Sequence, residues 1–177
     1  MKHLFLLRHA KSSWDIPSGS DRDRPLNRRG EAAAEQMAEH LARSGAALDT
    51  VLCSPALRTR QTLEAVLRYV PVSSPVIEEG LYLAGWRDLT ARLALLSDGI
   101  GTVLLIGHNP GLEDLALRLS DGGGDAAIAT RLREKYPTGA LAGLNLAIDS
   151  WSGLVPGCGR LVSFVRPADL GGPLIGD

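Results

Sequence analysis

Two histidines and two arginines stand where apolar segments of the chain end. Arg8 and His9 follow HLFLL, Arg58 follows VLCSPAL, and His108 follows VLLIG. Arginine guanidinium groups donate paired hydrogen bonds that match the oxygens of a phosphate. Histidine acts as a nucleophile or a proton donor near neutral pH. If these four side chains meet, they form a phosphate pocket that contains a reactive imidazole.

Each of these residues also has an ordinary structural explanation. An Arg-His pair after a strand is a weak signal by itself, Arg58 fits a solvated helix position, and His108 fits a turn before Asn-Pro. However, a cation near a helix N-terminus is mildly unfavourable unless an anion lies nearby. Because all three segments follow apolar runs, we favour one shared site. Ser12, in the loop after His9, is a further candidate donor to phosphate, with an ordinary loop serine as an equal alternative.

The apolar segments before these residues predict the strands of a sheet. Residues 3–7, 49–54 and 101–107 are short apolar runs bounded by polar residues, which is typical of parallel strands buried on both faces. In open α/β sheets, ligands bind at the carboxyl ends of such strands. The predicted sheet would therefore bring the four side chains to one edge.

The segments between the strands predict helices with clear starts. The first runs over residues 27–45, with Asn27 as its N-cap and Gly45 as its stop. The next has Ser54 as N-cap and Pro55 in the first helical position, and a later one repeats this pattern with Asn109 and Pro110. The other predicted elements are a loop over 10–26, a short strand within 72–82, a helix over 86–99, and two alternating segments at 140–149 and 159–167.

The alternation of strands and helices indicates an α/β protein, built as a three-layer α/β/α sandwich. Its central sheet is expected to be mostly parallel. The alternating segments at 140–149 and 159–167 predict a C-terminal antiparallel hairpin added to that sheet. We expect a single domain over residues 1–167 and a loosely ordered tail over residues 168–177.

The composition argues against several classes of function. With 19 Lys and Arg, 20 Asp and Glu and a net charge of −1, the 177-residue chain lacks the basic field of a nucleic-acid-binding protein. Its apolar stretches are too short for a membrane span or a signal peptide. Cys53 and Cys158 lack metal-ligand spacing, and we expect both to be reduced thiols. The expectation is a cytoplasmic monomer that binds neither nucleic acid, membrane nor metal.

Four segments together resemble a known family: LLRHAKSSWD, DRDRPLNRRG, SPALRTRQT and VLLIGHNPGLEDL. They are similar to segments of the histidine phosphatase superfamily, which has the phosphoglycerate mutase-like fold and is named for an Arg-His-Gly (RHG) motif. The closer resemblance is to its SixA-like phosphohistidine phosphatase branch. In that branch a variant, RHA-K-S, replaces the RHG motif. RPLN-x-x-G follows, and a GHNP motif carries the second histidine. The segments LYLAG and PTGALAGL extend the resemblance to about Pro167.

The resemblance implies a metal-independent phosphatase that forms a covalent phosphohistidine and needs no cofactor. In this scheme His9 is the nucleophile, Arg8 and Arg58 hold the equatorial oxygens, and His108 stabilises the transferring group from the opposite side. Phosphoryl transfer depends mainly on positioning and charge neutralisation, which two guanidinium groups supply without Mg²⁺. The implied partner is a protein phosphorylated on histidine, or else a small phosphorylated substrate.

The sequence leaves the general acid open. Members of the superfamily that cleave esters carry a carboxylic acid for the leaving alkoxide, and the candidates here are Asp15, Glu78 and Glu79, each of which also fits an ordinary surface position. Imidazole needs less help than an alkoxide as a leaving group, because its conjugate acid titrates near about pH 6.5. The chain also lacks a long insertion that would form a lid over the site. Both points favour phosphohistidine over the alternatives, a small-molecule phosphomonoesterase or a non-catalytic module that binds phosphorylated ligands.

Overall fold

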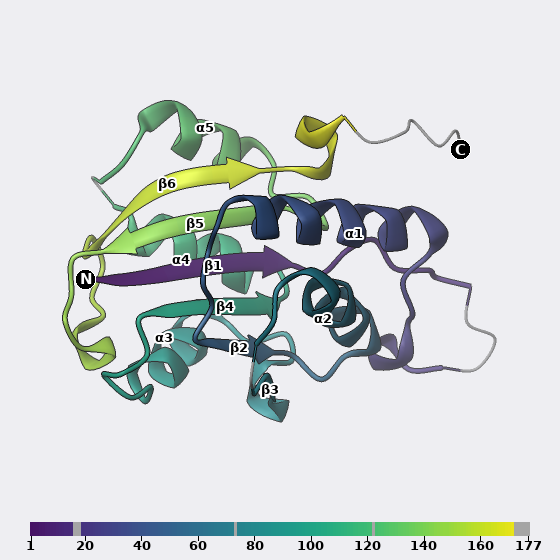
Figure 1. Cartoon of the computed structure of the whole chain (residues 1–177), viewed down its shortest axis with the longest axis horizontal. Coiled ribbons are helices and arrows are strands. Elements are labelled where there is room, and N and C mark those ends of the chain that lie inside the picture. Colours follow the sequence, from purple (N-terminus) through teal and green to yellow (C-terminus); the bar gives the residue numbers. More distant parts are fainter. Residues whose placement is uncertain (16–18, 73, 122, 172–177) are drawn as a thin grey trace.

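A six-stranded sheet forms the middle of the protein (Figure 1). The computed structural model describes residues 1–15, 19–72, 74–121 and 123–171. Along the sheet the strands follow the order β3-β2-β4-β1-β5-β6. Their bounds are β1 Lys2–Arg8, β2 Thr50–Cys53, β3 Val76–Ile77, β4 Thr102–Gly107, β5 Leu141–Leu146 and β6 Gly159–Val165.

The first four strands are parallel to one another. β1 pairs with β4, and β2 pairs with both β4 and β3, each in the parallel sense. β5 then runs antiparallel to β1, and β6 runs antiparallel to β5. The mostly parallel sheet and the C-terminal antiparallel hairpin are both confirmed. The carboxyl ends of β1, β2 and β4 therefore open at the same edge of the sheet.

Helices cover both faces of the sheet, so the three-layer prediction is also confirmed (Figure 1). α1 and α2 share one buried apolar cluster with one face of the strands, whereas α3, α4 and α5 share another cluster with the opposite face. Burial of these two faces supplies the main stabilising contribution. The helix bounds are α1 Arg28–Arg43, α2 Leu57–Tyr69, α3 Trp86–Ala94, α4 Gly111–Leu119 and α5 Ala126–Glu134.

Helix starts were predicted with mixed success. Asn27 caps α1 as expected, since its side chain accepts a hydrogen bond from the Gly30 amide at 2.8 Å. The predicted cap at Ser54 is wrong: α2 begins at Leu57 after Ala56, because the Ser54 hydroxyl instead contacts His108. The predicted start of α4 is wrong in the same way, since Pro110 occupies the cap position and the helix begins at Gly111. In both cases the helix begins further along the chain than predicted, so a short non-helical segment follows the strand.

Two glycines allow the loops around the site to approach the helices closely. The backbone carbonyl of Lys11 occupies the space that a side chain at Gly30 would need, and the carbonyl of Ala84 does so at Gly111. Any larger residue would push these loops away, since backbone cannot move aside as a flexible side chain can. The loop after His9 is thus seated directly on α1.

The remaining expectations concern the termini, the thiols and the membrane. Residues 167–170 form a short 3₁₀ helix, while residues 172–177 of the expected tail lie outside the described residues. Cys53 and Cys158 are both free thiols, and burial raises the pKa of Cys53 to about 12. Within the described ranges, none of the helices has the length and apolar character needed to cross a bilayer.

Candidate active site

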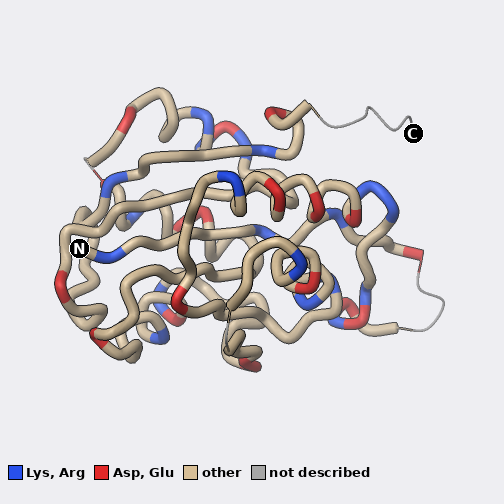
Figure 2. Tube along the Cα trace, in the orientation of Figure 1, with Lys and Arg blue, Asp and Glu red and all other residues tan. Residues whose placement is uncertain are grey.

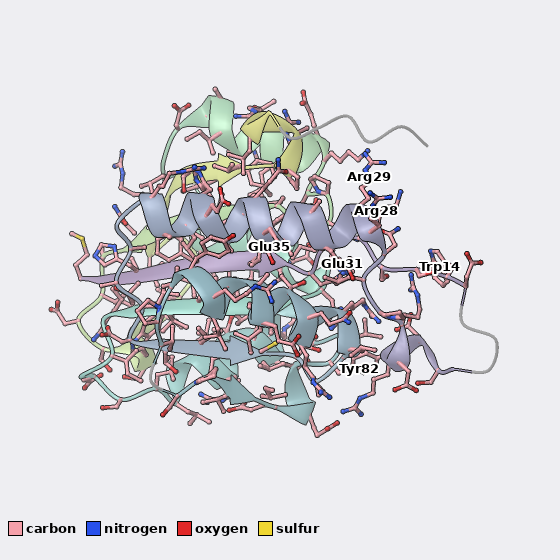
Figure 3. All side chains as sticks on the ribbon, turned by 45° about the vertical axis from the view of Figure 1, so that its right-hand side comes forward. Trp14, Arg28, Arg29, Glu31, Glu35 and Tyr82 are labelled. Atoms are coloured by element: carbon pink, nitrogen blue, oxygen red, sulfur yellow. The ribbon has the colours of Figure 1, made fainter. Side chains whose placement is uncertain are left out.

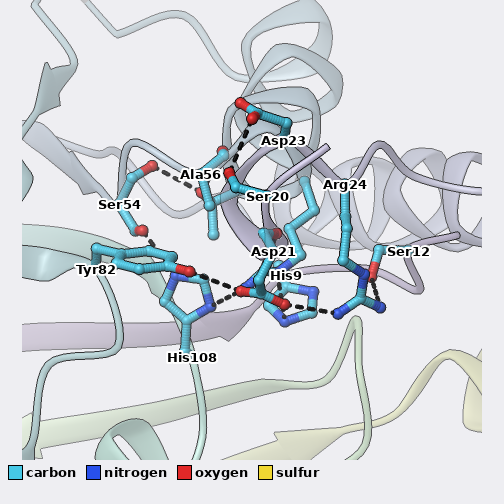
Figure 4. Close-up of polar contacts among 12 residues, drawn as sticks. His9, Ser12, Ser20, Asp21, Asp23, Arg24, Ser54, Ala56, Tyr82 and His108 are labelled. Carbon is cyan, nitrogen blue, oxygen red and sulfur yellow. Dashed lines mark hydrogen bonds and ion pairs between the residues drawn. The ribbon is translucent and has the colours of Figure 1, made fainter. Parts of the chain in front are cut away.

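Arg8, His9, Arg58 and His108 come together at the carboxyl edge of the sheet. Arg8 ends β1 and His9 follows it, Arg58 is the second residue of α2, and His108 directly follows β4. The two imidazole rings lie 5.2 Å apart between centroids (Figure 4). The Arg58 guanidinium lies against both, with its Nε 3.4 Å from His9 Nε2 and its Nη2 3.5 Å from His108 Nδ1.

Hydrogen bonds define which nitrogen of His9 is free. His9 Nδ1 lies 2.8 Å from the carbonyl oxygen of Ala10, which can only accept, so Nδ1 carries the proton. Nε2 then presents its lone pair toward Arg58, which can only donate. His9 is 8% exposed and lines a cleft.

The same reasoning orients His108. Its Nδ1 faces the Arg58 guanidinium, which can only donate, so Nδ1 is the unprotonated nitrogen. Its Nε2 is then the donor to the Ser54 hydroxyl, at 2.7 Å. This pair explains why Ser54 is not a helix cap. Once an anionic ligand is bound, a proton taken up on Nδ1 would be placed toward that ligand.

Both imidazoles are neutral at pH 7 in the free protein. Burial, followed by the nearby Arg58 and Arg8 charges, lowers the pKa of His9 to about 4, even though the Ala10 carbonyl favours the protonated form. Burial, together with His9 and Arg58, lowers the pKa of His108 to about 3. A buried histidine resists protonation because its charged form is poorly solvated. The His9 imidazole is therefore unprotonated well below neutral pH.

We expect both imidazole pKa values to rise when an oxyanion enters the site. A bound dianion offsets the arginine charges and stabilises each imidazolium, so the protonated forms become more favourable. NMR titration of the two rings, without ligand and with saturating tungstate, measures this shift. Without ligand we expect His9 to titrate near pH 4 and His108 near pH 3, and with tungstate we expect both at higher pH. Unchanged titration curves would mean that the anion does not bind beside these histidines.

Arg8 lines the same cleft, and one of its hydrogen-bond donors is unpaired in the described part of the chain. Its Nη1 donates to the Tyr136 carbonyl at 2.7 Å, which fixes the direction of the guanidinium. Its Nε is buried and has no hydrogen-bond partner among the described residues. Desolvation lowers the pKa of Arg8, although the group stays charged. An unpaired buried donor is costly, so an anion in the cleft would restore a favourable contact.

Asp21 is the main site residue that the sequence reasoning missed. Its carboxylate accepts from the Tyr82 hydroxyl at 2.7 Å, from Arg24 at 2.9 Å and from Arg58 at 3.0 Å (Figure 4). These hydrogen bonds hold the pKa of the carboxyl far below its usual range, with Tyr82 as the largest cause. Arg24 also donates to the Ser12 hydroxyl at 2.8 Å, so Ser12 is buried beside the cleft.

Asp21 orients the guanidinium group of Arg58. The backbone carbonyl of Asp21 accepts from Arg58 Nη1 at 2.6 Å, and its carboxylate accepts from Nη2 at 3.0 Å. The Nε edge of the guanidinium is thereby turned toward His9 and His108. Asp21 and Arg24 lie in DRDRPLN, a segment already matched to the family, but nothing in that pattern indicated which of its charges turn inward.

Replacing Asp21 by Ala should lower kcat/KM for an aryl phosphate by about tenfold to a hundredfold, the range expected for a misplaced catalytic group. The reason is that Arg58 loses one of its two anchors. Asp21→Asn should recover most of the activity, because the amide oxygen can still accept from Tyr82 and Arg58. Steady-state kinetics of both variants, with thermal melts to confirm folding, give the comparison. If Asn is as damaging as Ala, charge rather than orientation is what Asp21 supplies.

The side chains of Glu78 and Glu79, two of the three carboxylates suggested as a general acid, are paired with arginines outside the group of four. Glu78 makes two hydrogen bonds of 2.6 Å to Arg92, and the exposed Glu79 pairs with Arg22. Asp15 is exposed. Within the described part of the chain, none of the three makes a hydrogen bond or ion pair with Arg8, His9, Arg58 or His108. Likewise, no cluster of three or more His, Cys, Asp or Glu in that part could hold a metal ion.

Comparisons with known proteins agree with this geometry. Residues 4–83 match the family model of the histidine phosphatase superfamily (branch 1). An uncharacterized protein of Mycobacterium tuberculosis is 38% identical over 164 residues, which are 91% of this chain and 99% of that protein. The phosphohistidine phosphatase SixA of Escherichia coli is 34% identical over 122 residues, covering 67% of this chain and 74% of SixA.

A solved structure shows the same likeness in three dimensions. The putative phosphohistidine phosphatase SixA from Nakamurella multipartitia superposes with a TM-score of 0.81 at 29% sequence identity. The match covers 94% of this chain and 96% of that one. The shared fold thus includes the sheet and the edge at which Arg8, His9, Arg58 and His108 meet.

Proposed function

The chain is a phosphatase that belongs to the histidine phosphatase superfamily, with SixA-like relatives, and on this premise we propose that it hydrolyses phosphohistidine in proteins through a covalent intermediate on His9. The observation that carries the proposal is the locked ring of His9. Nδ1 is bound to the Ala10 carbonyl, and the Nε2 lone pair faces the cleft beside Arg58. We propose that the reaction needs neither a metal nor another cofactor.

In the first step, His9 Nε2 attacks the phosphorus of the substrate. The new N–P bond forms as the P–N bond to the substrate imidazole breaks, and that imidazole leaves with the bonding electron pair. Arg8 and Arg58 neutralise charge on the transferring oxygens, which is the dominant requirement of this chemistry. His108, protonated once the dianion is bound, donates from Nδ1 to an oxygen or to the departing nitrogen.

In the second step, water attacks the phosphorus of the phosphoenzyme. The His9 N–P bond breaks, the electron pair returns to Nε2, and inorganic phosphate is released. His108 is the neighbouring imidazole, 5.2 Å from His9 between ring centroids, and accepts a proton from the water. When phosphate departs, His108 gives up this proton to the phosphate or to solvent, and both rings return to the neutral state that the low pKa values favour.

The surroundings of the site suit a nitrogen leaving group. Carboxylates do lie near it, but the pKa of Asp21 is depressed by Tyr82, Arg24 and Arg58, so Asp21 is a poor proton donor. An alkoxide leaving group would need such a donor, whereas imidazole leaves with little assistance. Cleavage of a P–N bond is therefore the favoured reaction. The cleft volume of about 840 Å³ lies in the range of small-molecule sites, which keeps a phosphomonoesterase as the second candidate.

A comparison of substrates in the presence of EDTA tests this proposal. The protein is incubated with a phosphohistidine peptide, an alkyl phosphate and an aryl phosphate, and released phosphate is measured. We expect turnover in EDTA with the highest kcat/KM for phosphohistidine. A preference for alkyl phosphates would establish the phosphomonoesterase instead. Binding of all three without turnover would indicate a module that only recognises phosphorylated ligands, and loss of turnover in EDTA would contradict the metal-independent mechanism.

A further inference from the structure

The cleft that contains His9 continues well past the phosphoryl site. It measures about 840 Å³, far more than one phosphoryl group fills. Beyond the catalytic side chains it is lined by the start of α1, by residues 135–138 and by residues 166–168. Ala33, Pro137 and Pro167 supply apolar surface there. This outer part is available to whatever carries the phosphoryl group.

The lining of the whole cleft is strongly basic. It contains no acidic side chain among the described residues, although the chain as a whole has a net charge of −1. The positive charge is therefore concentrated at this site, and Figure 2 shows basic positions at the start of α1 and the end of β6. The basic lining residues are Arg8, Lys11, Arg24, Arg29, Arg58, Lys135 and Arg166.

Three exposed cations of this lining have no counter-charge among the residues that the structure describes. Arg166 is paired with Asp169, at 3.1 Å, and Arg24 is paired with Asp21. By contrast, Lys11, Arg29 and Lys135 are exposed and make no side-chain hydrogen bond or ion pair within the described ranges. Arg29 projects from the first turn of α1, where a positive charge is unfavourable beside the helix dipole (Figure 3).

A single phosphoryl dianion does not account for these three charges. The charges of Arg8, Arg24 and Arg58, partly offset by Asp21, match the two negative charges of the phosphoryl group. The three exposed cations come from other parts of the lining: the loop after His9, the start of α1 and the residue after α5. Like charges gathered at one site raise local anion concentration and repel cationic partners. The arrangement thus calls for further negative charge on the substrate, outside the phosphoryl group.

We propose that Lys11, Arg29 and Lys135 form a docking site for acidic residues that flank the phosphohistidine of the substrate protein. This inference rests on the proposed function, which it deepens. An extended acidic segment fits because the three cations are exposed, line one open cleft and belong to three separate segments of the chain. Trp14, which is 78% exposed and stacked on Arg24 at 3.2 Å from its ring centroid, borders the same cleft and adds apolar contact.

Two synthetic phosphohistidine peptides test the proposal. They differ only in flanking residues, three Glu in one and three Gln in the other. We expect a higher kcat/KM for the acidic peptide, mainly through a lower KM, and we expect the difference to shrink at high salt. Arg29→Glu should reduce the preference by about two- to fivefold, the usual range for one exposed ion pair, and the triple Glu variant of Lys11, Arg29 and Lys135 should reverse it.

Arg28→Glu is the matched control. Arg28 precedes Arg29 in α1 and is also exposed, but it does not line the cleft (Figure 3). Its substitution by Glu changes the net charge by the same amount as Arg29→Glu. It should leave the peptide preference and the turnover of an aryl phosphate unchanged. An equal loss in Arg28→Glu and Arg29→Glu would show a general field effect and overturn the docking site.

Binding to the inactive His9→Ala variant separates this inference from the proposed function. Fluorescence anisotropy of the two labelled peptides reports flank preference without turnover. Tighter binding of the acidic peptide that depends on Arg29 supports the docking site even if the wild-type protein fails to hydrolyse it. Hydrolysis of both peptides at equal rates and with equal binding would overturn the docking site while leaving the phosphatase activity intact. Stronger binding of a nucleotide than of the acidic peptide would assign the cleft to a small polyanion.

Discussion

We expect His9→Ala to lower kcat by at least about 10⁴-fold, the effect of removing a nucleophile. The reason is that His9 Nε2 is the free lone pair beside Arg58, whereas His108 points its Nε2 toward Ser54. Phosphate release from a phosphohistidine peptide measures the loss. Rapid acid-free quenching with ³²P-labelled substrate should trap label on the wild-type protein but not on the variant.

His3→Ala is a suitable control for the removal of a histidine. His3 lies at the start of β1, whereas His9 follows the end of that strand. The His3 side chain contacts Asn145. The His3→Ala variant should have the same activity as the wild-type protein. Turnover that survives in His9→Ala would refute covalent catalysis by His9. Labelling that moves to another residue would point to His108 as the nucleophile.

Arg58→Ala should lower kcat/KM by about 10³-fold, the lower end of what a charge-stabilising arginine contributes to phosphoryl transfer. Arg58 contacts both imidazoles and is only 3% exposed, so no neighbouring cation can replace it from solvent. Its loss should also weaken inhibition by inorganic phosphate. Kinetics with an aryl phosphate and phosphate titration measure the two effects.

Arg60→Ala provides the comparison within the same helix. Arg60 is exposed on α2, whereas Arg58 is buried, so the substitution removes a charge without touching the cleft. It should leave kcat/KM near the wild-type value. A thermal melt distinguishes lost catalysis from lost folding, because Arg58 also carries the hydrogen bonds to Asp21. A folded Arg58→Ala protein with normal kinetics would exclude Arg58 from the mechanism.

The strand ends could be predicted because their signals are local. An apolar run of five to seven residues before Arg8 or His108 indicates a buried strand, and parallel strands open at one edge. The convergence of the four side chains follows from topology alone. The helix α5, Ala126–Glu134, was not predicted, because Ile128 and Leu132 are its only large apolar residues and give too little periodicity.

Asp21 could not be predicted for a different reason. The segment DRDRPLN contains two aspartates and two arginines, and any of them would serve as a surface charge. Only the folded structure shows that Asp21 turns toward Arg58 and Tyr82 while Asp23 contacts Ser20. Long-range contacts of this kind depend on how three separate segments are packed. The partners of Glu78 and Glu79 were equally hidden in the sequence, since Arg92 and Arg22 come from other segments of the chain.

The hydrogen bond from His9 to its neighbouring carbonyl also has a regiochemical consequence. With Nδ1 engaged by Ala10, the phosphoenzyme that we propose would be the isomer substituted at Nε2. Phosphorylation at that position leaves the Nδ1 hydrogen bond intact, so the ring does not have to turn between the two half-reactions. The His9 ring would therefore have the same orientation in the free enzyme and in the phosphoenzyme. The phosphoryl group would then bind to and leave from the same side of the ring.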